Sequence, residues 1–209
     1  TWFGVGGCSK YYFQPSSEED LVSFLKNNEL NLPVYPLGAG SNIIIRDQGF
    51  NGIIIHFNKL KEIDIDKKGI ITAYCGAMDA EVARFARNHS RTNLEFLIGI
   101  PGTIGGGIKM NSGAYGSEIK KILIDVTAIN KNGILKKFTV KDLKLDYRTN
   151  KLSEEWMYVK ARFKSNNGSK DQIQKKMKEI IQSRKMSQPT GQKTGGSTFM
   201  NGKSFKAWQ

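Results

Sequence analysis

The chain has few of the residues that build disulfide frameworks and metal centres. Its 209 residues include two cysteines, Cys8 and Cys75, and two histidines, His56 and His89. Two cysteines so far apart exclude a disulfide scaffold and a zinc knuckle, and they favour a reducing compartment. HExxH, CxxC and EF-hand patterns do not occur, so we expect no metal site and interpret both histidines as surface or packing residues.

Long apolar runs are also missing. The longest candidates are short, strand-like segments such as residues 53–57, whereas a membrane-spanning helix needs about 20 apolar residues. We therefore expect no membrane segment. The first residue is Thr1 and not methionine, so the presence of a targeting peptide ahead of it stays open.

Acidic residues are outnumbered by basic ones. Lys and Arg total 32 and Asp and Glu total 19, a formal net charge of +13, which favours anionic partners such as nucleotides, acidic substrates or nucleic acid. The lysines are spread along the chain without a basic tail, which is typical of a solvated surface. A basic RNA-binding or interaction protein is the alternative from a different class, although the sequence has no RNA-binding signature.

Short periodic segments predict an α+β fold. Ser16 followed by Glu19 resembles a capping box and predicts the first helix, Asp79 is expected to cap a second helix, and Ser169 with Gln172 a third. Strands are expected just before Gly38 and at residues 43–45, 52–55, 70–74, 126–129, 134–138 and 158–163, with a hairpin turn at Asn132-Gly133.

Two of these segments carry a clear packing face. In the last strand, one buried face is expected to hold Val159, Ala161 and Phe163. In the last helix, the apolar stripe consists of Ile173, Met177, Ile180 and Ile181. The helix stripe indicates core packing and not a cofactor site.

Two glycine-rich segments are the most unusual feature of the sequence. Residues 38–42 read GAGSN, and residues 99–107 read GIPGTIGGG within an aperiodic stretch that runs to residue 116. Backbone N–H groups in such turns can converge on a dinucleotide diphosphate, because glycine allows close approach and positive φ. Either segment alone could be a structural turn, but two of them, each after a strand, favour a nucleotide.

The familiar nucleotide loops do not fit these segments. A Rossmann GxGxxG would need glycine in place of Ile43, and a Walker loop would need Gly-Lys-Ser/Thr where Gly107 is followed by Ile108 and Lys109. A GxSxG elbow is absent too, which argues against a serine hydrolase. The diphosphate would therefore be held by a less common pair of loops.

Two polar residues remain that chemistry could use. Arg148, in DYRTN, could hold a carboxylate through two hydrogen bonds, and Ser197, in GGSTF, could present a hydroxyl as a proton donor. Taken alone, each is more often a surface ion-pair residue or a turn residue.

Five motifs occur in an order that carries a resemblance. They are TWFGVGG at residues 1–7, PLGAGSNIIIRDQGF at 36–50, LEFLIGIPGTIGGGIKMNSGAYG at 94–116, DYRTN at 146–150 and TGGSTFMN at 194–201. Over nearly the whole chain, this set resembles the UDP-N-acetylenolpyruvoylglucosamine reductase family, flavoenzymes of peptidoglycan precursor synthesis. The short interval from Arg148 to Ser197 is similar to the shorter subtype, which lacks an extra substrate-covering loop.

The resemblance implies a domain plan. Residues 1–167 would form an FAD-binding domain of the vanillyl-alcohol-oxidase (PCMH) type, with subdomains at about 1–58 and 59–167. Residues 168–209 would form a linking helix and the beginning of a separate α+β substrate-binding domain, which we expect to be truncated. The family's catalytic glutamate, near the end of its longer chain, has no counterpart here, so this piece is expected to bind FAD and to turn over poorly.

The resemblance also implies the site residues. Arg148 falls at the position of the catalytic arginine and Ser197 at that of the proton-donating serine, while Lys185, Asn201 and Tyr147 would contact the substrate. The implied FAD-binding residues are Gly38, Ala39, Gly40, Ser41, Asn42, Gly99, Ile100, Pro101, Gly102, Thr103, Gly105, Gly106, Asn111, Gly113, Ala114, Tyr115 and Gly116. One departure affects the substrate side, because Met200-Asn201-Gly202 stand where the family usually has Lys and then Asn-Pro.

The resemblance implies a cytoplasmic enzyme of cell-wall synthesis. The chain would use bound FAD and NADPH to reduce UDP-N-acetylglucosamine enolpyruvate to UDP-N-acetylmuramate, and so serve peptidoglycan and cell-wall biogenesis, cell shape, cell division and the cell cycle. It would act as a monomer without nucleic-acid or membrane partners. The alternative within the same fold is an FAD oxidoreductase acting on a hydroxy acid or an alcohol.

Overall fold

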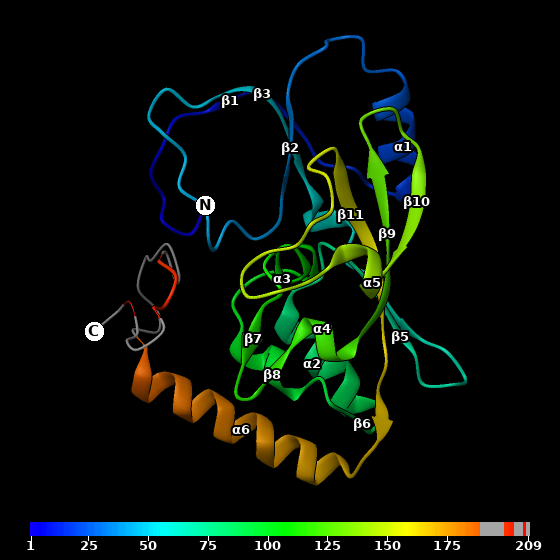
Figure 1. The fold of residues 1–209 in the computed structure, drawn as a ribbon, viewed down its shortest axis with the longest axis vertical. Helices are drawn as coiled ribbons and strands as arrows, with labels where there is room; N and C mark the ends of the chain where they lie inside the picture. The colour runs from blue at the N-terminus through cyan, green and yellow to red at the C-terminus, as the bar shows by residue number, and fades with distance from the viewer. Residues whose placement is uncertain (189–198, 203–206, 208–209) are drawn as a thin grey trace.

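The computed structural model describes residues 1–188, 199–202 and 207 (Figure 1). The strands are β1 (Ser9–Phe13), β2 (Val34–Leu37), β3 (Phe50–His56), β4 (Ile63–Ile65), β5 (Ile71–Tyr74), β6 (Arg91–Thr92), β7 (Gly113–Ala114), β8 (Ser117–Glu118), β9 (Leu123–Asn130), β10 (Leu135–Thr139), β11 (Trp156–Phe163) and β12 (Asn166–Asn167). The α-helices are α1 (Glu18–Lys26), α2 (Asp79–Asn88), α3 (Ile104–Lys109), α4 (Ile119–Ile122), α5 (Val140–Leu143) and α6 (Lys170–Ser187), with 3-10 turns η1 (Phe57–Lys59) and η2 (Glu95–Gly99).

The first sheet is parallel and has three strands in the order β1-β3-β2. The strand predicted at residues 43–45 is wrong, because this segment is an extended loop. Its neighbours pair with the start of the chain instead: the Trp2 N–H donates to the Gly40 carbonyl at 3.0 Å, and the Gly7 N–H donates to the Arg46 carbonyl at 2.9 Å. The residues after the first glycine turn therefore follow the N-terminal segment and leave the sheet.

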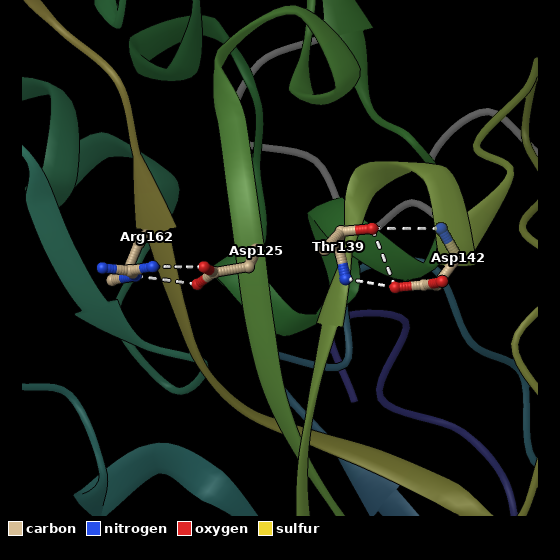
Figure 2. A network of polar contacts seen from close by, with 4 residues as sticks. All are labelled: Asp125, Thr139, Asp142 and Arg162. Carbon is tan, nitrogen blue, oxygen red and sulfur yellow. Dashed lines mark hydrogen bonds and ion pairs between the residues drawn. The ribbon is translucent and has the colours of Figure 1, made fainter.

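The second sheet has five strands in the order β10-β9-β11-β5-β4, and each neighbouring pair is antiparallel. The predicted hairpin is confirmed, since β9 and β10 flank a turn in which Gly133 has φ of +72°. Across β9 and β11, the Arg162 guanidinium donates a hydrogen bond to each carboxylate oxygen of Asp125, with Nε to Oδ1 at 2.8 Å (Figure 2). Such a two-pronged ion pair holds the centre of the sheet in register.

The buried face predicted for β11 is only partly right. Val159 packs with Ile53 and Met157 in one core cluster, whereas Ala161 and Phe163 belong to the other. The pairing of β11 with β9 shifts between Tyr158 and Lys160, which inserts one extra residue into β11. After this residue, the side chains at odd-numbered positions point to the opposite face of the sheet. A β-bulge of this kind gives no signal in the sequence pattern.

Helix starts were predicted to within one residue. Ser17, and not Ser16, caps α1 by accepting a hydrogen bond from the Asp20 N–H at 3.1 Å, while Ser16 donates to the Asp20 carboxylate. Ser169 caps α6 as predicted, with its hydroxyl accepting from the Gln172 N–H. The prediction for α2 is wrong, because Asp79 is its first helical residue and lies fully buried.

Two hydrophobic clusters form the core. The smaller one joins α1 and β3 to one face of the second sheet, and the larger one fills the space between the other face and helices α2, α3, α4 and α6. Figure 1 shows α6 running along the edge of the molecule below the labels of β7 and β8. This helix packs against η2. Three of the four predicted stripe residues of α6 are buried, and Ile181 is 38% exposed.

Within residues 1–188 and the short described pieces beyond them, no helix combines the length and apolarity needed to cross a membrane. The same part of the chain holds no group of three or more His, Cys, Asp or Glu side chains arranged to bind a metal ion.

Candidate cofactor and substrate site

The structure brings the two glycine-rich segments together. The first follows β2 and the second lies between η2 and α3. The Ser41 hydroxyl donates to the Pro101 carbonyl at 2.9 Å, across 60 residues of sequence. Gly38 lies directly against Thr103, so the two runs lie side by side.

Several main-chain N–H groups in this stretch have no acceptor among the described residues. They belong to residues 39–42 of the first run and to Gly102 and Thr103 of the second, whereas Ile104 and Gly105 donate to the Ala77 and Cys75 carbonyls at 2.9 Å. Gly102 and Thr103 are buried, and a buried N–H without an acceptor is unfavourable unless a ligand supplies one. Free N–H groups on two adjoining glycine turns suit a diphosphate.

Glycine is required where the runs touch. A Cβ on Gly38 would overlap the Thr103 hydroxyl, and Gly102 has φ of +155°, which residues with a side chain rarely adopt. At Gly106, which is exposed, the nearest atom to an added Cβ would be Thr103 Oγ1 at 3.8 Å. The cradle is therefore closed on the protein side and open on the other, and its residues fit the diphosphate of FAD.

The third predicted segment, residues 111–116, borders the second run. An added Cβ on Gly99 would lie 2.7 Å from the Tyr115 ring, so this ring rests against the loop. Gly113, Tyr115 and Gly116 are exposed. Asn111 is buried, and its side chain donates to the Glu118 carboxylate and accepts from the Lys120 N–H, both at 2.9 Å. The Asn111 N–H also donates to the Ile108 carbonyl at 3.1 Å, which leaves its carbonyl as the group without a hydrogen-bond partner among the described residues.

A residue that the sequence reasoning missed braces the second run from outside. Arg184, in the last turn of α6, donates from Nη1 to the Gly99 carbonyl at 2.7 Å. Its position continues the buried stripe of Ile173, Met177 and Ile180 at helical spacing, so the periodicity of α6 could have identified it. Lys185, the neighbour that was predicted to contact substrate, is exposed at the end of the same helix.

His56 supports the first run. At the end of β3, its ring forms a hydrogen bond with the Tyr12 hydroxyl, and the pairing of β3 with β2 places His56 opposite Leu37, the residue before Gly38. Burial lowers the pKa of His56 below its ordinary value, so the ring is neutral at neutral pH. The role of His56 is thus structural, which agrees with its interpretation as a packing residue.

Asp79 lies beneath the second run. Its N–H donates to the Gly102 carbonyl at 3.0 Å, and an added Cβ on Gly107 would lie 3.3 Å from its carboxyl. Both carboxyl oxygens are buried, and neither has a hydrogen-bond partner among the described residues. Burial raises the pKa of the Asp79 carboxyl from 3.8 to about 8, so the group is mainly protonated at neutral pH.

This raised pKa predicts a pH-dependent stability. Between pH 4 and pH 8 the folded chain holds a proton on Asp79 that the unfolded chain has lost, so the free energy of unfolding should fall as pH rises, by up to about 1.4 kcal/mol per pH unit. Below pH 4 and above pH 8 this contribution should become flat. Urea unfolding of the FAD-free protein between pH 4 and pH 9 measures it, and Asp79→Asn should remove this part of the slope. An unchanged slope in that variant would contradict the assignment.

The predicted catalytic arginine projects from a tight turn. Thr139 caps α5, exchanging hydrogen bonds with Asp142, and α5 leads into this turn (Figure 2). The turn is closed by Asp146 and Thr149, whose main chains are bonded to each other in both directions at 3.0 and 3.1 Å. Arg148 itself has φ of +54°, which is uncommon for a residue with a side chain.

Two residues of the TGGSTFMN motif meet this turn. Arg148 Nη1 donates to the Phe199 carbonyl at 2.6 Å, and the Asn201 N–H donates to the Tyr147 hydroxyl at 3.3 Å. The structure thus brings together three of the residues predicted for the substrate side, namely Tyr147, Arg148 and Asn201. The predicted proton donor, Ser197, lies outside the described residues.

Comparisons with known proteins show the family to which the chain belongs. The model of a family described as an FAD binding domain matches residues 9–139. UDP-N-acetylenolpyruvoylglucosamine reductases from Rickettsia bellii (strain RML369-C) and Orientia tsutsugamushi (strain Boryong) are 43% and 42% identical to the chain, over 100% of the chain and 70% of each relative. The structure is also similar to that of UDP-N-acetylenolpyruvylglucosamine reductase (MurB) from Thermus caldophilus, with a TM-score of 0.85 and 27% identity, covering 99% of this chain and 73% of the other.

A more distant likeness concerns the fold alone. Glucooligosaccharide oxidase from Acremonium strictum has a TM-score of 0.59 and 14% identity, covering 77% of this chain and 36% of the oxidase.

Fold, glycine cradle and family model together define an FAD-containing oxidoreductase with a PCMH-type FAD-binding domain. Within that class, the chain belongs to the UDP-N-acetylenolpyruvoylglucosamine reductase family. The predicted fold class and family are therefore confirmed.

Proposed function

We propose that the chain provides the flavin cradle and part of the substrate side for the NADPH-dependent reduction of UDP-N-acetylglucosamine enolpyruvate to UDP-N-acetylmuramate. One observation carries the proposal: two runs of unsatisfied main-chain N–H groups meet, and the second run leads through α3 to the turn that presents Arg148. Bound FAD supplies the hydride chemistry, accepting a hydride from NADPH and passing it to the substrate. The protein supplies binding, orientation and charge.

Arg148 is proposed to bind the enolpyruvyl carboxylate. Hydride addition to the β-carbon drives negative charge toward that carboxylate, so a guanidinium already in place stabilises the transition state more than the ground state. Nη1 is engaged with the Phe199 carbonyl, and no other hydrogen bond from this guanidinium is found among the described residues. The remaining N–H groups are available for a carboxylate.

Ser197 is proposed to protonate the α-carbon from its hydroxyl. It stands two residues before Phe199 in the sequence, on the segment whose described part bonds to Arg148. Tyr147, Asn201 and Lys185 are proposed to contact the UDP-sugar. For Tyr147 and Asn201, the supporting observation is their mutual hydrogen bond beside Arg148.

The finer assignments are proposals as well. The FAD-binding residues predicted from the sequence are proposed to line the cofactor, in a domain at residues 1–167 with subdomains at about 1–58 and 59–167, followed by a substrate domain from residue 168. We expect a cytoplasmic monomer without nucleic-acid or membrane partners, acting in cell-wall synthesis and through it in cell shape and division. The two free cysteines, Cys8 and Cys75, suit a reducing compartment.

Anaerobic kinetics on the full-length protein test the proposed reaction. The purified protein should be yellow, NADPH should bleach the flavin absorbance, and UDP-N-acetylglucosamine enolpyruvate should restore it. Colourless protein that resists reconstitution with FAD would contradict the cofactor assignment. A flavin reoxidised only by oxygen, or reduced directly by a hydroxy acid or an alcohol, would instead favour another oxidoreductase of this fold.

A further inference from the structure

Asn150, directly after the Arg148 turn, ties that turn to two other elements. Its Nδ2 donates to the Lys109 carbonyl at 2.7 Å, at the end of α3. Its Oδ1 accepts from the Tyr158 hydroxyl of β11 at 3.1 Å and from the Leu152 N–H at 3.2 Å. One amide thus joins the glycine-rich helix, the central strand of the second sheet and the turn.

Tyr158 is well placed to hold this amide still. Its side chain is buried in the larger core cluster, with 8% of its surface exposed, and β11 is paired on both sides. The hydroxyl donor also determines which end of the amide carries oxygen, and therefore directs Nδ2 toward the Lys109 carbonyl. A rigid strand thereby orients a side chain at the surface.

The Lys151 N–H donates to the Leu143 carbonyl at 2.9 Å and so joins the two sides of the turn, but residues 146–149 have few other anchors among the described residues. Tyr147 is 47% exposed, and residues 146 and 149 are exposed too. Apart from the bonds within the turn, the Arg148 and Tyr147 contacts run to the Phe199 and Asn201 segment. The tie through Asn150 is what relates the turn to α3, which starts in the second glycine run.

We propose that Asn150, oriented by Tyr158, is a positioning residue that sets the Arg148 guanidinium relative to the flavin cradle. This inference rests on the proposed function, because it acts through the contact of Arg148 with the substrate carboxylate. A misplacement of about 1 Å in such a group can cost about 100-fold in rate. Loss of the tie should therefore impair the substrate half-reaction and spare both FAD binding and flavin reduction by NADPH.

Two substitutions separate the contacts in the full-length holoenzyme. Asn150→Asp keeps the oxygen that accepts from Tyr158 and Leu152 but places a carboxylate oxygen against the Lys109 carbonyl, and Tyr158→Phe removes the orienting hydroxyl alone. Each should slow reoxidation of reduced flavin by substrate by about 10- to 100-fold. Thr149→Ala, in the same turn, removes a hydroxyl whose one hydrogen bond within the described part of the chain goes to the Asn150 carbonyl, at 3.5 Å, and should stay within about twofold of wild type.

A double-mutant cycle then distinguishes positioning from general damage. If Asn150 acts through Arg148, Asn150→Asp should add little to the defect of Arg148→Ala. Equilibrium titration of substrate into the oxidised holoenzyme should show weaker binding in Asn150→Asp, and hydrogen exchange of the FAD-free protein should be faster over residues 146–150.

The outcomes are distinguishable from a failure of the proposed function. An Arg148→Ala variant with normal reoxidation would overturn both ideas. A slow Arg148→Ala variant would leave the proposed function standing. If Arg148→Ala is slow, two results would overturn the positioning role alone. One is an Asn150→Asp variant that reoxidises at the normal rate, and the other is a double variant in which the two defects multiply fully.

Discussion

Replacing Arg148 with alanine in the full-length protein should slow reoxidation of the reduced flavin by substrate by about 10²- to 10³-fold, which is typical for loss of one preorganised charge donor. Flavin reduction by NADPH and the FAD content should stay near wild type, because the side chain reaches the Phe199 carbonyl and the Tyr147 ring, and among the described residues it forms no hydrogen bond with the glycine runs. Anaerobic stopped-flow absorbance separates the two half-reactions.

A second substitution at Arg148 tests whether the planar pair of guanidinium donors is needed in addition to the positive charge. Arg148→Lys keeps a positive charge but loses the planar pair of donors, so we expect reoxidation between the rates of wild type and Arg148→Ala. The substrate concentration dependence should show a fall in the limiting rate, since the contact is proposed to strengthen in the transition state. Normal reoxidation in Arg148→Ala would refute the role of Arg148.

Adding one methyl group at Gly38 should weaken FAD binding by about 10- to 100-fold. The new Cβ would overlap the Thr103 hydroxyl. Because the Thr103 side chain is buried and β-branched, it has little freedom to rotate away. The two glycine runs must then move apart, at a cost of about 1–3 kcal/mol for overpacking, and each 1.4 kcal/mol is a tenfold change in Kd. Fluorescence titration of the FAD-free variant with FAD measures the loss.

A second-site substitution provides the control. In Gly38→Ala combined with Thr103→Ala, the overlapping oxygen is gone and the nearest remaining atom is Cβ of residue 103 at 3.4 Å, an ordinary contact. FAD affinity should return to that of Thr103→Ala alone. If the double variant binds FAD as poorly as Gly38→Ala, the meeting of the two runs is not what the cofactor requires. Circular dichroism of all three variants checks that each folds.

Local patterns predicted most of the regular structure. The hairpin at residues 132–133, the strand before Gly38 and the cap at Ser169 follow from turn chemistry, periodicity and capping, each of which acts over a few residues. The errors arose where longer-range contacts decide. Residues 43–45 are apolar and β-branched, but they lie next to the N-terminal segment and not in a sheet. Val159 changes clusters because of a bulge set by pairing with β9.

Asp79 illustrates the same limit at the site. An aspartate before an amphipathic segment is typical of a helix cap, and nothing within a few residues reveals that the Gly102 loop will cover it. Its burial, and hence its raised pKa, exists only once residues 76–79 and 102–107 pack together.

By itself, the sequence determined the composition of the site: glycine where main chain must approach closely, an arginine in a tight turn, and motifs in an order that identifies the family. These follow from residue identity, because φ preference and donor geometry belong to the side chain. Only the tertiary structure decided that Ser41 meets Pro101, that Arg184 braces Gly99 and that Asn150 joins the arginine turn to α3. Those contacts join residues 41 to 85 positions apart, and their distances depend on how the sheets and helices pack.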